Sequence, residues 1–187
     1  MADSESICVF AGSSAGARPE YLAAARALGA ALARRGHDLV YGGSATGLMG
    51  AVADAVLEGG GTVCGVIPQF LVDKEIAHPA LTELVVVSSM HERKREMARR
   101  ASAFVALPGG LGTLEEFAEA LTWAQLGLHT RPCGLLDVGG FYAPLLAFFD
   151  HACSEGFVNP NHRALIVRSA DVSELLDRLG ARRQAAR

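Results

Sequence analysis

The chain has 187 residues, half of which are hydrophobic, and this length suits one well-buried domain better than two. Its formal net charge of −3 and pI of about 6.1 argue against nonspecific binding to nucleic acid or to an anionic membrane, because both need a basic surplus. The first residues lack the features of a signal peptide, and no apolar run approaches the length of a membrane span. We therefore expect a cytoplasmic protein with one domain over residues 1–180 and a flexible tail over 181–187.

Short β-rich segments alternate with longer helical patterns along the whole chain. The expected strands cover residues 6–12, 38–43, 62–68, 83–89, 103–110, 131–138 and 164–169. The expected helices cover residues 19–36, 47–59, 90–101, 113–126, 141–155 and 171–180. This alternation predicts an α/β fold with a doubly wound, Rossmann-like parallel sheet and helices on both faces. Ligands of such sheets bind beyond the carboxyl ends of the strands, so the strand-to-helix loops are the places to search.

The cysteines are scattered without a CxxC pair, each in or beside an apolar run. They are Cys8, Cys64, Cys133 and Cys153. We expect buried free thiols, as in a reducing compartment.

Three strand-to-helix loops, at residues 10–21, 41–50 and 107–117, are rich in glycine. Any one of them could be a simple tight turn, but three together favour a ligand site. The second loop has the GxxxxG frame of a Walker A motif, yet Leu48 and Met49 occupy the positions of the required lysine and serine or threonine. It is therefore not a P-loop.

The third loop, "LPGGLGTLEEF", does not match the dinucleotide fingerprint, because Glu115 stands where that fingerprint needs its third glycine. The loop nevertheless precedes a helix, and the backbone N–H groups from Gly110 to Leu114 are expected to be unsatisfied at the positive end of the helix dipole. Such a helix start is a natural site for phosphate.

Glu116 has two interpretations. Thr113 and Glu116 have the spacing of a capping box, in which the glutamate only reaches back to the start of the helix. On a helical wheel, however, Glu116 lies opposite the apolar face, so that the carboxylates point away from the core and are available for chemistry. The polar side holds Glu115, Glu116, Glu119 and Thr122, and the apolar face holds Leu114, Phe117, Ala120, Leu121 and Ala124.

The segment 88–100 is expected to form a basic helix with an unusual apolar stripe. Lys94 projects into the middle of this stripe and Arg93 lies on its flank, which an ordinary solvated face would not require. The stripe itself consists of Met90, Met97 and Ala101, and the expected surface residues are Glu92, Arg95, Glu96, Arg99 and Arg100. His91 and Glu92 begin like the zinc-binding motif HExxH, but position 95 is arginine where the motif needs histidine. No metal site is therefore expected.

These segments resemble the Lonely Guy (LOG) family of cytokinin-activating nucleotide hydrolases. "PGGLGTLEE" (108–116) matches its PGGxGTxxE motif, and "MHERK" (90–94) matches its second motif. The resemblance also includes "VFAGSSAGARPEY", "YGGSATGLMG", "LTWAQLGLH" and "EGFVNP", and thus nearly the whole chain. One departure is that Ser44 and Ala45 stand where many relatives have Gly-Ser.

The resemblance implies hydrolysis of the N-glycosidic bond of N6-substituted adenosine 5′-monophosphates, with AMP as a possible substrate, without a metal or cofactor and in a homodimer. It implies that Glu116 stabilises the oxocarbenium ion and orients water, while Arg93 offsets charge on the leaving purine or the sugar phosphate. The implied substrate-binding residues are Glu75, Arg93, Lys94, Gly109, Gly110, Leu111, Gly112, Thr113, Leu114, Glu115 and Thr122.

Three other functions come into consideration for a chain of this kind. A protein of this fold could only carry a phosphorylated heterocycle, as molybdenum-cofactor carriers do, but Arg93 and Glu116 favour an enzyme. A nucleotide-sensing or DNA-processing module is disfavoured by the acidic charge balance. Relatives have also been labelled lysine decarboxylases, but neither Lys74 nor Lys94 resembles a lysine that would hold pyridoxal phosphate.

Overall fold

The computed structural model describes residues 5–74 and 76–185, and its centre is a parallel sheet of seven strands. The strands are β1 (Ser6–Phe10), β2 (Asp38–Tyr41), β3 (Val63–Pro68), β4 (Glu83–Val87), β5 (Ala103–Ala106), β6 (Cys133–Leu136) and β7 (Ile166–Ser169). Their order across the sheet is β4-β3-β2-β1-β5-β6-β7. All seven predicted strands exist, and the predicted α/β fold is confirmed.

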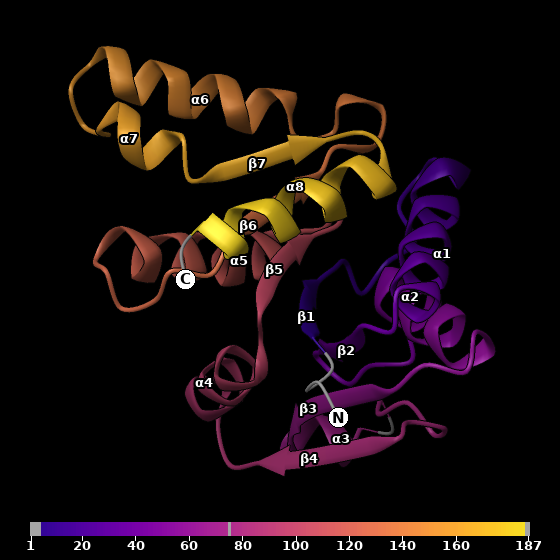
Figure 1. Cartoon of the computed structure of the whole chain (residues 1–187). Helices are drawn as coiled ribbons and strands as arrows, with labels where there is room; N and C mark the ends of the chain where they lie inside the picture. Colours follow the sequence, from indigo (N-terminus) through magenta and orange to yellow (C-terminus); the bar gives the residue numbers. More distant parts are fainter. Residues whose placement is uncertain (1–4, 75, 186–187) are drawn as a thin grey trace.

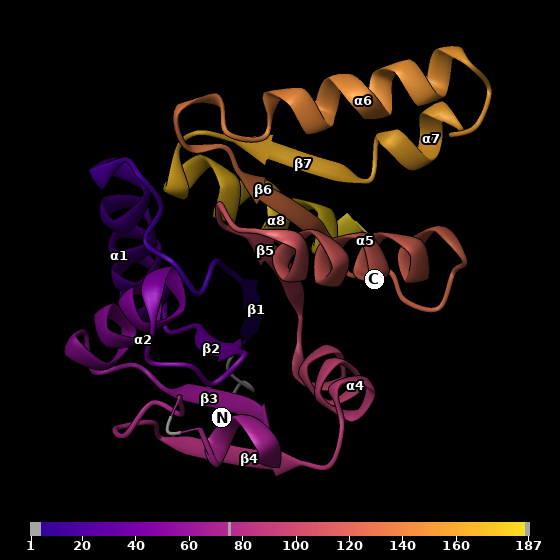
Figure 2. The ribbon, with the colours of Figure 1, turned by 180° about the vertical axis from the view of Figure 1, so that it is seen from behind.

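Helices cover both faces of this sheet (Figures 1 and 2). One apolar core lies under α1 (Pro19–Arg34), α2 (Gly47–Glu58) and α8 (Val172–Ala185). The other lies under α4 (Met90–Arg100), α5 (Leu111–Gln125) and α6 (Ala143–Ser154). The short elements are α3 (Gln69–Val72), the 3-10 turn η1 (Val138–Gly140) and α7 (Pro160–Arg163).

The order of the strands determines where a ligand can bind. β1 pairs with β2 on one side and with β5 on the other, so the direction of winding reverses between β1 and β5. Loops that leave neighbouring strands at such a point diverge to opposite faces and open a crevice at the carboxyl end of the sheet. The first and third glycine-rich loops leave β1 and β5 and therefore border this crevice.

Most predicted boundaries differ from the observed ones by a few residues, and two differences at helices matter here. The helix expected to end at residue 180 continues to Ala185, so residues 181–185 extend α8 instead of forming a flexible tail. The helix expected to begin at residue 113 begins at Leu111, with Gly110 as its N-cap. Leu175, Leu176 and Leu179 bury one side of α8, which explains why this helix remains attached to the sheet.

The cysteine prediction holds with one exception. Cys8, Cys64 and Cys133 are buried and free, whereas Cys153 is only partly buried. Cys153 is the last residue but one of α6.

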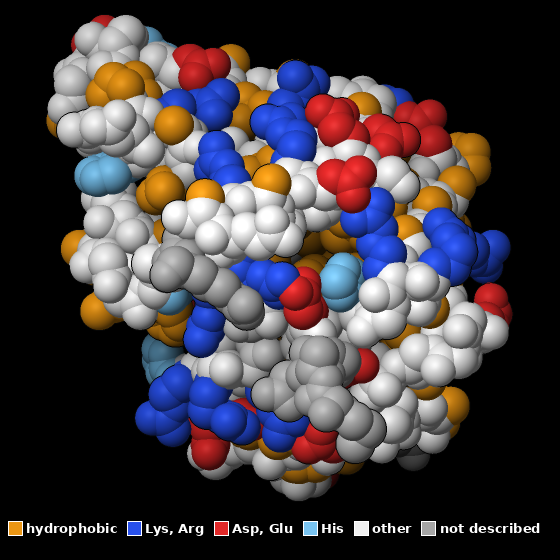
Figure 3. All heavy atoms as spheres, viewed as in Figure 1, with side chains coloured by type: hydrophobic (Ala, Val, Ile, Leu, Met, Phe, Trp, Pro, Cys, Tyr) orange, Lys and Arg blue, Asp and Glu red, His pale blue; other side chains and the backbone are white. Residues whose placement is uncertain are grey.

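In the part of the chain that the structure describes, no helix is both long and apolar enough to cross a membrane. Figure 3 shows basic and acidic side chains interspersed on one face of the molecule. That face carries no broad field of one sign of the kind that a nucleic-acid backbone would select.

Helices α1 and α2 pack against each other so closely that a glycine is required between them. A β-carbon on Gly29 would lie 2.5 Å from the carbonyl oxygen of Val52 and 2.8 Å from Cβ of Ala55. A β-carbon on Gly180, in the interior of α8, would meet no atom of the described part of the chain within 4 Å. The two helical glycines thus have opposite environments.

We expect opposite effects of the same substitution at these positions. Gly29→Ala should lower the free energy of unfolding, because overpacking of about 1–3 kcal/mol outweighs the gain in helix propensity. Gly180→Ala should raise it by about 0.5–1 kcal/mol, since alanine gains propensity without a clash. Urea unfolding of both variants measures the difference, and stabilisation by Gly29→Ala would contradict the close packing.

Candidate active site

The glycine-rich loops meet through direct backbone contacts. The N–H of Gly12 donates to the carbonyl of Pro108 at 3.1 Å, which joins the first loop to the third. The N–H of Leu48 donates to the carbonyl of Gly12 at 3.0 Å, which joins the second loop to the first. A β-carbon on Gly12 would lie 3.2 Å from Cα of Gly109, so a side chain there would push the loops apart. Part of the glycine content therefore serves loop packing.

The second loop is held by its own hydroxyl groups and by the segment that follows α3. The buried hydroxyl of Ser44 lies 2.9 Å from that of Thr46 and accepts a hydrogen bond from the Thr46 N–H. The N–H of Ala45 donates to the carbonyl of Ile76. The residues that depart from the family pattern thus fit an ordered loop.

The glycines of the third loop have two different roles. A β-carbon on Gly109 would lie 2.6 Å from Cβ of Thr113, so this position is closed by the protein itself. At Gly110 and Gly112 such a carbon would meet no atom of the described residues within 4 Å, and these glycines therefore border open space. Among the described residues, the N–H groups of Leu111, Gly112 and Thr113 at the start of α5 have no hydrogen-bond partner. They are available to an anion.

Arg93 and Glu116 form a buried ion pair next to these N–H groups. Nη1 of Arg93 lies 3.2 Å from Oε1 of Glu116, and the two side chains are 9% and 10% exposed. Nε of Arg93 donates to the carbonyl of Val66 at 3.1 Å, which fixes the plane of the guanidinium against β3. A β-carbon on Gly42 would overlap this guanidinium, so glycine at that position leaves the space that Arg93 occupies.

The capping-box and helical-wheel interpretations of Glu116 are both wrong. Because α5 begins at Leu111, Thr113 occupies its third position, and no side chain caps the helix. Glu116 does not point away from the protein, because its carboxylate is turned toward Arg93 of α4 and is buried there. Leu114, which the wheel placed on the apolar face, is 38% exposed. A helical wheel describes the faces of a single helix. It could not show that Glu116 contacts a buried cation on another helix.

Burial changes the acidity of the carboxylate. Burial raises the pKa of Glu116, and the neighbouring charge of Arg93 opposes this shift without cancelling it. The side chain therefore binds a proton at a higher pH than an exposed glutamate does.

Lys94 lies beside this pair and is already neutralised within the chain. Its side chain is 11% exposed, and Nζ lies 3.2 Å from Glu119 and also contacts Glu115. Burial lowers the pKa of Lys94, but the hydrogen bonds to the two carboxylates outweigh it and raise the pKa overall. Lys94 thus links α4 to α5 and is not a free cation.

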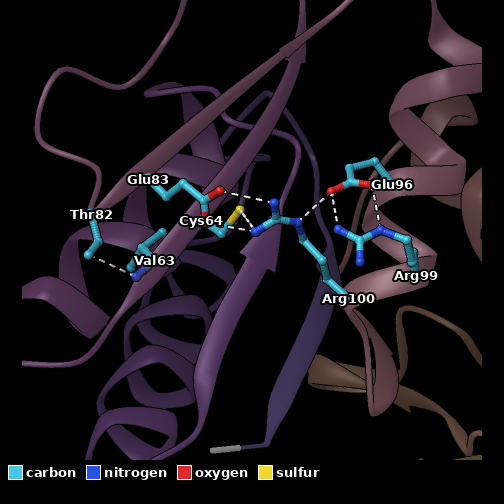
Figure 4. Close-up of polar contacts among 7 residues, drawn as sticks. All are labelled: Val63, Cys64, Thr82, Glu83, Glu96, Arg99 and Arg100. Carbon is cyan, nitrogen blue, oxygen red and sulfur yellow. Dashed lines mark hydrogen bonds and ion pairs between the residues drawn. The ribbon is translucent and has the colours of Figure 1, made fainter.

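The other end of α4 is attached to the sheet by Arg100 (Figure 4). Its guanidinium makes two hydrogen bonds to Glu83 of β4, at 2.7 and 3.0 Å, and one to Glu96 at 2.7 Å. It also lies 3.3 Å from Sγ of Cys64 in β3. The prediction that Arg100 is an ordinary surface residue is therefore wrong, since it holds α4 against β3 and β4.

A cavity of about 260 Å³ joins the free N–H groups to the ion pair. Several predicted site residues line it: Arg93, Gly110, Leu111, Gly112, Thr113, Glu115 and Glu116. Sequence reasoning missed the other lining residues: Ala11, Gly12, Ser13, Met49 and Met90. The glycine-rich character of the first two loops was the available signal, but the convergence of the loops depends on the tertiary structure.

Four predicted site residues lie outside the lining of this cavity. Gly109 packs under Thr113, Leu114 is on the outer side of α5, and Lys94 is paired as described. Thr122 is exposed, and its hydroxyl donates to the carbonyl of Ala118 in its own helix. Glu75 lies outside the described residues.

The described part of the chain holds no group of three or more His, Cys, Asp or Glu side chains placed to bind a metal ion. Lys74 is exposed, and Lys94 is engaged with two carboxylates. Neither lysine is the free, sheltered amine that a Schiff base requires.

The site can be compared with known proteins. A family model described as "Possible lysine decarboxylase" matches residues 49–179. Cytokinin riboside 5′-monophosphate phosphoribohydrolase LOG7 of Arabidopsis thaliana is 53% identical over 92% of this chain and 80% of its own length. The enzyme LOG of Oryza sativa subsp. japonica is also 53% identical, over 92% of this chain and 72% of its own length. The chain belongs to the LOG family.

Solved structures share the fold at lower identity. A molybdenum cofactor (Moco) carrier protein from Chlamydomonas reinhardtii superposes with a TM-score of 0.73 at 26% identity, covering 96% of this chain and 97% of that one. A molybdenum cofactor binding protein from Rippkaea orientalis gives a TM-score of 0.72 at 22% identity, covering 97% and 98%. These comparisons confirm the Rossmann-like arrangement.

We expect Glu116 to titrate at a higher pH than exposed glutamates. Replacing Arg93 with Met should raise the Glu116 pKa further, because the charge that lowers it is removed. Carbon-13 NMR of glutamate-labelled protein measures both values, with Glu116→Gln as the assignment control.

Glu92 provides an internal reference, since hydrogen bonds from Ser88 lower its pKa. A Glu116 midpoint at or below that of Glu92 would contradict the effect of burial.

Proposed function

We propose that this protein hydrolyses the N-glycosidic bond of N6-substituted adenosine 5′-monophosphates and releases the free base and ribose 5-phosphate. The observation that carries the proposal is the buried Arg93–Glu116 pair next to unsatisfied N–H groups at the start of α5. The family relatives named as cytokinin riboside 5′-monophosphate phosphoribohydrolases support it.

The phosphate binds first in this mechanism. It accepts hydrogen bonds from the N–H groups of Leu111, Gly112 and Thr113, where the helix dipole favours an anion. Gly110 and Gly112 leave room for the phosphate oxygens to reach the backbone. One turn further along α5, the anchored ribose faces Glu116.

The chemical step then depends on Glu116 in its ionised form. As the bond between C1′ and the purine nitrogen breaks, its electron pair leaves with the purine and positive charge develops on the sugar. The carboxylate stabilises that charge in a site where water is largely excluded. Water adds to C1′, and one of its protons is transferred to the departing base. Arg93 orients Glu116 and balances negative charge on the leaving purine or the sugar phosphate.

A carrier of a phosphorylated heterocycle is the second candidate, since Moco carrier proteins share the fold. It has less support, because the curated relatives at 53% identity are named as hydrolases. A carrier would bind nucleotide without releasing a base, so turnover distinguishes the two functions.

Two further parts of the proposal concern the setting of the enzyme. By family resemblance, we propose that the protein acts as a homodimer and in the cytoplasm. AMP is included as a candidate substrate, because the phosphate and ribose contacts do not depend on the N6 substituent.

Glu116→Gln should retain nucleotide binding and lose turnover. The amide keeps the shape of the side chain but not its charge, so kcat should fall by at least about a hundredfold. Chromatography of base released from isopentenyladenosine 5′-monophosphate measures turnover, and calorimetry measures binding. Glu58→Gln, on an exposed position of α2, is the control. Near-normal kcat in Glu116→Gln would exclude the catalytic role.

The enzyme should require the 5′-phosphate. Losing several charge-assisted hydrogen bonds, each of about 1.5–3 kcal/mol, should lower kcat/KM on the nucleoside by at least about a thousandfold relative to the nucleotide. Part of the loss should appear in kcat, because the phosphate also positions the sugar.

Gly112→Asp provides a matched test of the same anchor. Gly112 borders open space, so the variant should fold, but its carboxylate should repel the phosphate. Gly180→Asp makes the same change at an open helical glycine in α8 and should leave hydrolysis intact. Equal kcat/KM on nucleoside and nucleotide would show that the phosphate anchor is wrong.

A further inference from the structure

The segment between α3 and β4 pairs with the second glycine-rich loop. The N–H of Ala45 donates to the carbonyl of Ile76 at 3.0 Å. Two residues further along the segment, the N–H of His78 donates to the carbonyl of Gly43 at 2.9 Å. Between these hydrogen bonds the two stretches form a short antiparallel bridge. We call residues 76–81 the bridging segment, and the position of the second loop depends on it.

The side chain of His78 attaches the bridging segment to α2. It is only 6% exposed, and its Nε2 lies 2.9 Å from Oδ1 of Asp54 in α2. Its Nδ1 lies 3.2 Å from the backbone nitrogen of Ala80. A backbone N–H can only donate, so Nδ1 accepts, and the proton of the neutral ring lies on Nε2 and is donated to Asp54. Pro79 restricts His78 to an extended backbone, which suits its pairing with the loop.

The bridging segment packs against both of the backbone stretches that hold Arg93. One is the second loop, where Gly42 leaves the space that the guanidinium occupies. It is directly followed by Gly43, the residue that accepts the hydrogen bond from the bridging segment. The other stretch is β3, where the carbonyl of Val66 accepts a hydrogen bond from Nε of Arg93. A shift of the segment would therefore act on both neighbours of the guanidinium.

Leu81 makes the contact on the β3 side. A β-carbon on Gly65 would overlap Cδ1 of Leu81 and would lie 2.8 Å from Cα of Gly43. The leucine, the loop and the strand thus pack without spare space. The turn after His78 sets the direction in which the chain reaches Leu81. The ring contacts of His78 therefore influence the packing on β3 as well as on the loop.

The bland alternative is that the contact between His78 and Asp54 only stabilises the fold. Asp54 is 59% exposed, so water competes for its carboxylate and the hydrogen bond adds little to the free energy of unfolding. The backbone hydrogen bonds of the bridging segment do not need the imidazole. What the ring adds is direction, because its two nitrogens make bonds on opposite sides and fix the segment between α2 and its own turn.

We propose that the hydrogen bond between His78 and Asp54 positions the guanidinium of Arg93 against Glu116, by holding the bridging segment on the second loop and on β3. Both side chains lie outside the lining of the catalytic cavity, so they are positioning residues. The consequence for catalysis rests on the proposed function, whereas the position of Arg93 does not.

The first test measures the pKa of Glu116 without any substrate. In His78→Ala the guanidinium of Arg93 should move away from the carboxylate, so that its charge lowers the Glu116 pKa less and this pKa rises. The change should have the same direction as in Arg93→Met and should be smaller. Carbon-13 NMR of glutamate-labelled protein measures it, and urea unfolding of the same samples measures stability separately.

The second test is kinetic. His78→Ala should lower kcat for isopentenyladenosine 5′-monophosphate by about tenfold, because a small displacement of a catalytic group is costly. KM should change by less than about threefold, since the N–H groups proposed to bind the phosphate are not part of the contact. A merely structural role would not produce this division between kcat and KM.

Substitutions of Asp54 isolate the hydrogen bond. Asp54→Asn keeps an oxygen that accepts from Nε2 of His78 and should behave like the wild type, whereas Asp54→Ala should reproduce the effects of His78→Ala. Because Asp54 is exposed on α2, Asp54→Ala should fold even if His78→Ala does not. His37→Ala is the matched control. The imidazole of His37 lies 3.8 Å from Glu5 at the opposite end of β2, and its loss should change neither the Glu116 pKa nor kcat.

The outcomes separate this inference from the proposed function. An unchanged Glu116 pKa in both Asp54→Ala and His78→Ala would overturn the inference, whatever the change in stability. Equal defects in Asp54→Asn and Asp54→Ala would also overturn it, because the hydrogen bond would then not be the cause. If the wild type releases no base, the proposed function fails, but the Glu116 titration still decides whether the contact positions Arg93. If the wild type is active and the titration does not respond, the hydrolase remains and the positioning role is wrong.

Discussion

The buried contact between Arg93 and Glu116 is the constraint on which the rest of the site depends. Both side chains are about nine-tenths buried, and removing two charges from water costs several kcal/mol for each ion. Their attraction roughly offsets that cost only when the geometry is good and the remaining hydrogen-bonding groups are satisfied. Such a pair is therefore weak evidence for a role in stability. It requires that the surrounding elements hold both groups in place.

The surrounding structure meets that requirement from several directions. The carbonyl of Val66 accepts a hydrogen bond from Nε of Arg93, and the missing side chain of Gly42 leaves space for the guanidinium. α4 is held to the sheet by Arg93 near its start. Near its end it is held by Arg100, as Figure 4 shows. Lys94 adds contacts to two glutamates of α5. The position of Arg93 thus follows from three ion-pair or hydrogen-bond systems, not from the propensity of one helix.

The same arrangement explains how the proposed anion site and a carboxylate can share one helix. The free N–H groups lie in the first turn of α5, where the dipole is positive, while Glu116 lies in the second turn and faces Arg93. The positive charge of Arg93 offsets the negative charge of Glu116, which would otherwise repel a phosphate. Packing among the glycine-rich loops keeps the intervening space open at Gly110 and Gly112.

The sequence by itself determined the class of the fold and predicted an anion site at the third loop. Alternation of β-rich and helical segments is a local pattern, so it predicted all seven strands and the parallel sheet. The motifs around Arg93 and Glu116 identified the family, and the glycines before α5 predicted an anion site.

What the sequence could not determine was the direction in which Glu116 points. That direction depends on Arg93, which is 23 positions earlier in the chain and on another helix. Gly42 and Val66 have no local signature of contact with Arg93, and the pairing of Lys94 with Glu119 is likewise nonlocal. Tertiary structure decided these features, since burial and ion pairing arise only when separate elements pack against each other.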